Sequence, residues 1–442
     1  MLSRLPIPSI FAPFRLLLAA LSISAASDAC AQVLTIPQMP YGDYRAPEIP
    51  DKIPDKPSLP LAFSIPVAPL GFTAPRAVYL FHHASLVSLD FLDENRLLFT
   101  FPSPGLLERQ SRNDASVTER KIHAVVLTLP DGKVQSEASW ILPDWARYLW
   151  MLNDGHFLLR NLRDGLDLGD ASLKTAPYLH FPGQLLWLEM DPAQKLIVTN
   201  WLESATPPQP PATPPAAGAA PKSDATLVVR TQQRESGQLL SVTRVPFTSQ
   251  SKDWAMNSQG YLVKSHDSDG RWLLTLQFFA GDSRPFGHVD SGCPPDYSFI
   301  SDTELLVIVC DPPGGQKIEA LSANGDLLWQ GKNSPNAYWP LLIMAPNGLR
   351  AAQETLLLKR PADKYKRNLS ARDFLGQVVR VFDAATGNIV LEAPIAPMLD
   401  GGGNVAISPS GRRVAILTGG VIEVFSLPAP AQFPAAPSPS AH

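Results

Sequence analysis

The stretch NVAISPSGRRVAILTGGVIEVFSL, residues 404–427, carries the pattern that decides the fold. Three short runs rich in valine, isoleucine and leucine are separated by the turn sequences SPSG and TGG. Short apolar runs bounded by glycine and serine are typical of β-strands joined by tight turns. The stretch therefore predicts three consecutive antiparallel strands.

The first hairpin of this stretch belongs to a type that recurs along the chain. In each copy a polar turn separates two apolar strands, as in SLDFLDENRLLFTF (88–101), YLWMLNDGHFLLRN (148–161) and LWLEMDPAQKLIVTN (186–200). Seven such hairpins are expected, turning near Asp93, Asn153, Asp191, Asn257, Ser301, Asn347 and Ser408.

A second hairpin type follows the first and has a glycine in its turn, because glycine readily adopts the positive φ that tight hairpins require. Its copies are HAVVLTLPDGKVQSEASW (123–140), LVVRTQQRESGQLLSVTRV (227–245), KIEALSANGDLLWQGK (317–332) and VVRVFDAATGNIVLEA (378–393). Two hairpins in tandem make a four-stranded unit of about 50 residues, the period of a propeller blade. We therefore expect an all-β, seven-bladed β-propeller of four-stranded antiparallel blades.

The last blade shows only three strands in the sequence. We expect its missing outer strand to come from RAVYLFHH, residues 76–83, so that an N-terminal strand closes the ring and removes an open sheet edge.

The segments ISPSGRRVAILTGGVIEVFSLP (407–428) and VRVFDAATGNIVLEAP (379–394) resemble blades of the YVTN/quinoprotein-like β-propellers, a WD40-like superfamily. The resemblance implies the propeller fold over roughly 340 residues and no particular activity. The Gly-His and Trp-Asp signatures of WD40 blades are absent. NGDLLW (324–329) resembles the TGKxxW repeat of quinone enzymes but occurs once, so no quinone cofactor is predicted.

Residues 1–31 have the layout of a secretory signal peptide. Arg4 and Arg15 precede an apolar run, and Ala29-Cys30-Ala31 forms an A-x-A site with cleavage expected after Ala31. Two alternatives remain open: lipoprotein processing at Cys30, and an N-terminal helix that is kept. The first reading predicts a periplasmic or extracellular protein with no membrane-spanning segment.

Proline composition divides the rest of the chain, which has 45 prolines in 442 residues. We expect residues 32–75 to be a Pro-rich extended lead-in and residues 76–428 to be the propeller. Residues 204–223 and 429–442 read as a disordered Pro-rich loop and a disordered tail.

Two of the three cysteines, Cys293 and Cys310, flank one predicted hairpin. Paired positions in a hairpin share a constant sum, and a turn through residues 301–304 gives a sum near 603 to 605. The two cysteines sum to 603 and should lie opposite each other or one step apart. Directly opposed residues are close enough for a disulfide, which suits an exported protein. The alternative is two separate buried thiols.

No linear motif identifies a catalytic, metal or cofactor site, so catalytic residues stay unknown and no metal or cofactor is predicted. SHDSDGRW (265–272) partly resembles the Asp-box turn of sialidases, with Asp267 and Asp269 as weak calcium candidates. The net charge of −4 is spread along the chain, which argues against a nucleic acid partner. We expect a monomer.

Topology gives the best indication of a ligand site. The longest insertions, residues 103–120, 204–223 and 361–373, all join second to third strands and should emerge on one face. The residues that begin the innermost strands should share that face, and aromatic side chains there suit ligand binding if they are exposed. The predicted ligand-binding residues are Arg147, Tyr148, Trp254, Asp296, Tyr297 and Trp339.

Two classes of function follow. The first is a non-enzymatic interaction module that binds a protein, peptide or glycan through its loop face. The second is an enzyme on the same scaffold, such as a lactonase, a lyase or a quinoprotein-like dehydrogenase, with acids or histidines from different blades meeting at the channel mouth. The lack of linear motifs favours the interaction module.

Overall fold

A computed structural model describes most of the chain outside its N-terminus. The chain divides into two units, residues 1–44 and 45–442, and all described residues lie in the second. The described residues are 52–74, 87–103, 119–143, 147–162, 164–203, 226–246, 255–311, 315–332, 336–359, 373–399 and 403–431.

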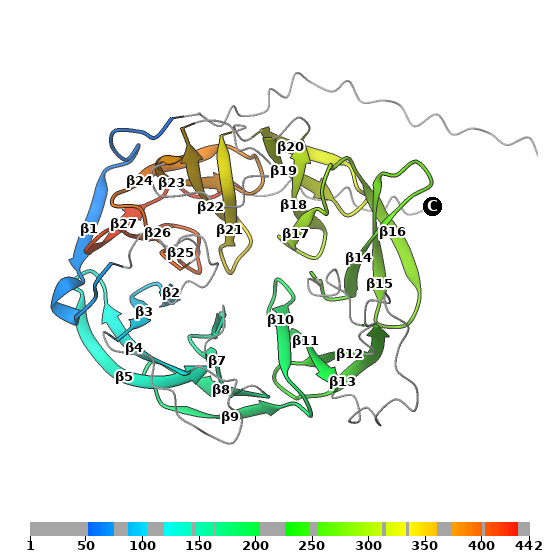
Figure 1. Cartoon of the computed structure of the whole chain (residues 1–442), viewed down its shortest axis with the longest axis horizontal. Coiled ribbons are helices and arrows are strands. Elements are labelled where there is room, and N and C mark those ends of the chain that lie inside the picture. Colours follow the sequence, from blue (N-terminus) through cyan, green and yellow to red (C-terminus); the bar gives the residue numbers. More distant parts are fainter. Residues whose placement is uncertain are drawn as a thin grey trace, which may run out of the picture. The chain divides into compact units, whose positions relative to one another are not determined.

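These residues form seven small antiparallel sheets arranged in a ring (Figure 1). Blades 1 to 3 contain β2 (Ser88–Asp93), β3 (Arg96–Pro102), β4 (Glu119–Thr128), β5 (Lys133–Pro143), β6 (Leu149–Met151), β7 (Phe157–Leu162), β8 (Gly165–Gly169), β9 (Thr175–His180), β10 (Leu185–Met190), β11 (Leu196–Glu203), β12 (Thr226–Gln233) and β13 (Leu239–Pro246). Blades 4 and 5 contain β14 (Gly260–His266), β15 (Trp272–Phe278), β16 (Ser283–Val289), β17 (Asp296–Phe299), β18 (Glu304–Asp311), β19 (Gly315–Ser322) and β20 (Leu327–Lys332). Blades 6 and 7 contain β21 (Ala337–Met344), β22 (Arg350–Leu358), β23 (Phe374–Asp383), β24 (Ile389–Ile395), β25 (Val405–Ile407), β26 (Arg413–Leu417), β27 (Val421–Ser426) and β1 (Leu61–Pro66).

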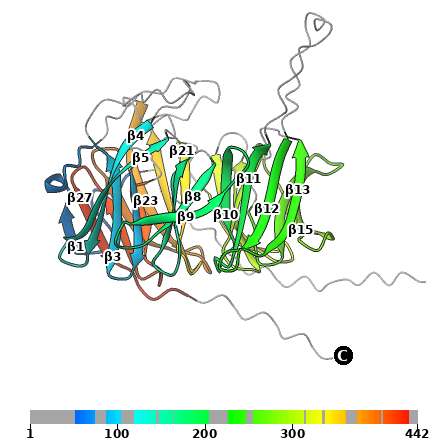
Figure 2. The same cartoon turned by 90° about the horizontal axis from the view of Figure 1, so that it is seen from below.

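The seven inner hairpins predicted from the sequence are all present, so the blade count and the all-β fold class are confirmed. Blade 4 has three named strands, and among the described residues its innermost strand is represented by a bridge between Met256 and Tyr261. The strands run between two faces of the ring (Figure 2). We call the face where the innermost strands begin the strand-start face, and the face where the inner hairpins turn the hairpin face.

Hydrophobic clusters fill every seam between neighbouring blades. The largest one joins blades 6, 7 and 1 around Phe99, Val379 and Phe425, which are all fully buried. Five smaller clusters pair the remaining neighbours in turn around the ring. Because each sheet buries both faces against its neighbours, the second strands are nearly continuous apolar runs, which explains why the pattern was readable in the sequence.

The strand that closes the ring is β1, which pairs with β27 as the outer strand of blade 7. An N-terminal strand was expected here, but its assignment to residues 76–83 was wrong, and those residues lie outside the described part. β1 and the short 3-10 helix η1 (Ala68–Leu70) fall within the segment predicted to be an extended lead-in. Pro66 ends the strand at the rim of the ring, where a proline is tolerated because an edge strand needs a partner on one side only.

The glycines of the outer hairpins adopt positive φ as predicted. Gly387 has a φ of 71°, and a Cβ built on it would lie 2.5 Å from the Trp329 ring of blade 5. The indole N–H of Trp329 donates a 2.8 Å hydrogen bond to the carbonyl oxygen of Ala384, just before this turn. The glycine therefore serves both the turn and the seam between blades 5 and 6.

Among the described residues, no helix has the length and apolar character needed to cross a bilayer. The predicted Pro-rich loop and most of the predicted tail lie outside the described part.

Candidate functional site

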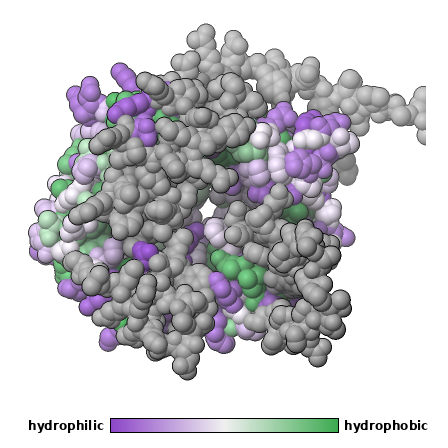
Figure 3. All heavy atoms as spheres, in the orientation of Figure 1, coloured by the Kyte–Doolittle hydropathy of each residue, from purple (hydrophilic) through white to green (hydrophobic). Residues whose placement is uncertain are grey.

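A cavity of about 710 Å³ occupies the axis of the ring and is walled by the innermost part of every blade. The hollow is visible at the centre of the space-filling view (Figure 3). Its volume lies in the range that accommodates small ligands or a few side chains of a partner. It is the candidate functional site.

The strand-start end of this cavity, which we call the mouth, carries Arg147, Lys264, Asp296 and Tyr297. Arg147 and Asp296 are exposed, while Lys264 and Tyr297 are half-buried. The guanidinium carbon of Arg147 lies 5.3 Å from the centroid of the Trp150 ring. The mouth thus presents both signs of charge to solvent, together with the half-buried ring of Tyr297.

Lys264 is held between blades 4 and 5. Its ammonium nitrogen donates a 3.3 Å hydrogen bond to the carbonyl oxygen of Pro295 and lies 5.5 Å from the centre of the Tyr297 ring. The Tyr297 hydroxyl donates to the carbonyl oxygen of Leu262 at 3.3 Å. Blade 4 lacks a full innermost strand among the described residues, so a side chain of its second strand reaches the cavity.

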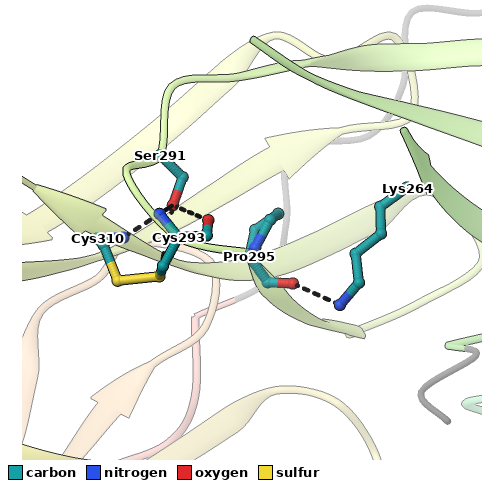
Figure 4. Close-up of a disulfide and its surroundings, with 5 residues drawn as sticks. All are labelled: Lys264, Ser291, Cys293, Pro295 and Cys310. Carbon is teal, nitrogen blue, oxygen red and sulfur yellow. Dashed lines mark hydrogen bonds between the residues drawn. A yellow bond between two sulfur atoms is a disulfide. The ribbon is translucent and has the colours of Figure 1, made fainter. Parts of the chain in front are cut away.

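The predicted bond between Cys293 and Cys310 is present, with the Cα atoms 5.5 Å apart (Figure 4). The register of β17 and β18 pairs Asp296 with Ile308, a sum of 604, so the cysteines are one step from direct opposition, as expected. The Ser291 hydroxyl donates to the carbonyl oxygen of Cys293 at 2.7 Å and accepts the N–H of Cys310 at 3.0 Å. The disulfide therefore fixes the chain immediately before Pro295 and the mouth.

The structure places the predicted aromatic residues in different environments. Tyr148 is only 4% exposed, and its hydroxyl lies 2.7 Å from that of Thr100 in the seam between blades 1 and 2. Burial raises the pKa of Tyr148, with the Thr100 hydrogen bond opposing it. Tyr297 lines the cavity. Trp254 lies outside the described residues, as do the three long insertions apart from end residues of the first and third, and the side chain of Trp339 in β21 is not described.

Asp90 is a cavity residue that the sequence did not single out. It is half-buried on β2, and its carboxylate accepts a 2.5 Å hydrogen bond from the Ser88 hydroxyl. Burial raises the pKa of Asp90, while the Ser88 hydrogen bond and the charge of Arg147 oppose this effect. The sequence offered one signal for this residue: on a short innermost strand of alternating side chains, an acidic residue stands between Leu89 and Phe91.

Asp191 is the second cavity acid that was missed, because it reads as an ordinary polar turn residue. It is 1% exposed, at the hairpin-face end of the cavity. Its Oδ1 accepts the N–H of Leu196 at 2.6 Å, whereas Oδ2 is buried and has no hydrogen-bond partner among the described residues. Burial raises the pKa of Asp191; turn N–H groups oppose this and the charge of Asp302 adds to it.

The cavity wall is divided into a polar and an apolar side. Blades 1 to 3 contribute Ser88, Asp90, Arg147, Glu189, Asp191 and Gln194. Blades 6 and 7 contribute only apolar side chains and glycine, among them Ile343, Val405 and Ile407. A ligand that fits both sides must itself have a polar and an apolar part.

Within the described part of the chain, no three His, Cys, Asp or Glu side chains gather closely enough to hold a metal ion. Asp267 instead organises its own turn, accepting the N–H groups of Asp269 and Arg271 at 2.9 Å each. His288 and Arg271 also lie within 3.1 Å of its Oδ2. The Asp-box-like stretch is thus a closed polar turn at the rim.

Comparison with protein families and with curated proteins finds no match for the chain. Among solved structures, the WD40 β-propeller domain of Doa1 is 9% identical with a TM-score of 0.38, covering 80% of this chain and 95% of that one. TolB from Acinetobacter baumannii is 13% identical with a TM-score of 0.35, covering 74% and 77%. The chain is a seven-bladed β-propeller. Its similarity to these propellers extends to the fold alone.

Proposed function

We propose that this propeller is a non-catalytic interaction module that holds a polypeptide segment of a partner at the mouth. The observation that carries the proposal is the axial cavity, whose wall combines apolar side chains with charged groups, among them Arg147, Lys264 and Asp296 at its strand-start end. Binding sites for ligands and partner side chains have this composition. The apolar wall of blades 6 and 7 favours a polypeptide over a glycan, because sugars need hydrogen-bonding groups on most sides.

The disulfide and the residues of the mouth support the same proposal. Tyr297, Lys264 and the Pro295 carbonyl are linked to one another across two blades, and the cysteine bond fixes the chain that enters β17. A mouth held in one geometry loses little conformational entropy on binding. Preorganisation of this kind is typical of recognition sites.

We further propose that the protein acts outside the cytoplasm. The signal-peptide pattern of residues 1–31 and the single cysteine bond are compatible with export. Peptide mapping of the exported protein should then begin at Gln32. A lipid-modified Cys30 would instead establish the lipoprotein alternative, and a retained N-terminus would contradict cleavage.

The interaction is tested by capture from the exported fraction with two matched variants. Arg147→Ala/Asp296→Ala removes one base and one acid from the mouth. Arg244→Ala/Glu203→Ala removes an exposed ion pair (N···O 3.2 Å) on the outer part of blade 3 and serves as the control. The mouth variant should lose a polypeptide that the wild type and the control retain. Equal capture by both variants contradicts the proposal, and loss of the captured species on glycosidase treatment would assign a glycan.

An enzyme on this scaffold is the second candidate, supported by one observation. Asp90 and Asp191 both line the cavity and both have a raised pKa caused first by burial, as general acids often do. Screening lactone and glycoside substrates with wild type and with Asp90→Asn tests this candidate. Turnover that disappears in the variant would favour the enzyme, and its absence from the wild type leaves the interaction module.

A further inference from the structure

We propose that the hairpin-face half of the central cavity is a binding site for a primary ammonium group carried on an aliphatic chain. This inference rests on the proposed function and names the chemistry of the group that enters the cavity. The residues that would receive the ammonium are Asp191, Glu189 and Trp187 of blade 3. The chain behind it would lie against blades 6 and 7.

Asp191 is the anchor of the site. A carboxylate that is 1% exposed normally has hydrogen-bond partners on both oxygens, because an unpaired buried charge is costly. Here the turn N–H of Leu196 reaches Oδ1, and Oδ2 has no partner among the described residues although the residue lines the cavity. An ammonium group supplies both the missing donor and the missing charge.

Trp187 adds an aromatic ring to the same wall. The residue is half-buried on β10 together with Glu189. The face of an indole ring attracts cations. An aromatic ring beside two carboxylates is a combination that favours an organic cation over an anion.

The basic groups near this end of the cavity are already engaged or exposed. Arg234 lies 2.7 Å from a carboxylate oxygen of Asp154 and donates to the Gln194 carbonyl, and Lys195 is exposed. The two basic residues that line the cavity, Arg147 and Lys264, belong to the mouth. Among the described residues that line the cavity, the hairpin-face half thus has acidic side chains and no basic ones.

The apolar wall decides what the cation is attached to. In a ring of seven, blade 3 stands opposite blades 6 and 7, and Figure 1 shows β10 across the ring from β21 and β25. Met344, Ala406 and Ile407 line the cavity on that side. An ammonium at Asp191 would direct an attached methylene chain across the axis toward these side chains, which would bury it. A small inorganic cation would leave this wall unused.

Calorimetric titration with six-carbon probes tests the site. Hexylamine should bind the wild-type protein at least tenfold more tightly than hexanol, and hexanoate should show no binding. Nα-acetyl-lysine methylamide, compared with its norleucine analogue, presents the same ammonium from a polypeptide. If both ammonium probes bind, the ammonium group can come from a lysine side chain of a polypeptide. If hexylamine alone binds, the ligand is a free amine. Hexanoate binding as tightly as hexylamine overturns the proposal.

Variants locate the binding. Asp191→Asn keeps an oxygen for the Leu196 N–H but loses the charge, and should weaken hexylamine at least tenfold. Asp131→Asn, at an exposed outer turn, is the matched control and should leave the affinity unchanged. Glu189→Gln provides a second, independent variant if the melting temperature of Asp191→Asn is too low for the titration. Unchanged affinity in both cavity variants overturns the site. Partner capture at the mouth by Asp191→Asn reports separately on the proposed function.

Discussion

Lys264 of blade 4 and Tyr297 of blade 5 lie against each other at the mouth, with the ammonium nitrogen 5.5 Å from the centre of the phenol ring. The pair joins two blades at the one place where the described part of a blade lacks a full innermost strand. A contact between neighbouring blades at the cavity rim fixes the shape of the mouth. The contribution of this contact to the free energy of unfolding can be measured with two substitutions, one that removes only the Tyr297 hydroxyl and one that also removes the ring.

Tyr297→Phe should cost about 1 kcal/mol of the free energy of unfolding, because it removes the hydrogen bond from the hydroxyl to the Leu262 carbonyl. Tyr297→Ala should cost clearly more, since it also removes the ring from Lys264 and from the seam between blades 4 and 5. Urea unfolding of the two variants gives the comparison. Equal losses would show that the ring contributes nothing.

Gly387→Ala should destabilise the protein strongly. The residue has a positive φ, and the new Cβ would meet the Trp329 ring. Gly237→Ala is the matched control, because its φ of 67° is similar and a Cβ there meets nothing within 4 Å. We expect the control to lose about 1–2 kcal/mol of the free energy of unfolding, from backbone conformation alone, and Gly387→Ala to lose more. Similar losses in both variants would mean that the ring moves freely aside.

The cysteine bond should be detected by mass spectrometry of the unreduced protein as a peptide linking Cys293 to Cys310. Cys293→Ser/Cys310→Ser should lower the free energy of unfolding by about 3 kcal/mol in the chain-entropy account of a loop of this size. Reducing agent should lower the urea midpoint of the wild type and leave that of the variant unchanged. Two alkylatable thiols without reduction would contradict the bond.

Asp191 should make stability depend on pH. The pKa of aspartate in the unfolded chain is about 3.9, and burial raises the pKa of Asp191 in the folded protein. The unfolded state therefore loses its proton first, so this residue lowers the free energy of unfolding as the pH rises from about 4 through the raised pKa. Urea unfolding from pH 3.5 to 7 gives the free energy of unfolding of the wild type and of Asp191→Asn. The wild-type value minus the variant value should fall as the pH rises over that range. A flat or rising difference would contradict the buried carboxylate.

The repeat made most of the fold predictable. Each inner hairpin has its own polar turn between apolar runs, and the outer hairpins have glycine at Gly132, Gly237, Gly325 and Gly387, all at positive φ. The closing strand was misplaced because prolines around Leu61–Pro66 concealed a short alternation in which only Ile65 is buried. Residues 76–83 matched the strand pattern better, but pairing with β27 depends on tertiary contacts that no local pattern contains.

The candidate site was predicted only in part. Topology placed Arg147, Asp296 and Tyr297 at one end of the axis, because innermost strands run parallel to one another around a propeller. Topology could not show that Tyr148 turns into a blade seam to meet Thr100. Asp191 was hidden for another reason: an aspartate that organises a turn is common, and only its burial in the cavity distinguishes it.

Site-specific photo-crosslinking tests the central claim, that a partner binds at the mouth of the axial cavity. A benzophenone side chain placed at Asp296 probes the mouth, and one placed at Arg244 probes the outer part of blade 3. The account predicts that the partner crosslinks from position 296 and not from position 244. Crosslinking from position 244 alone would place the partner on the rim and contradict the account.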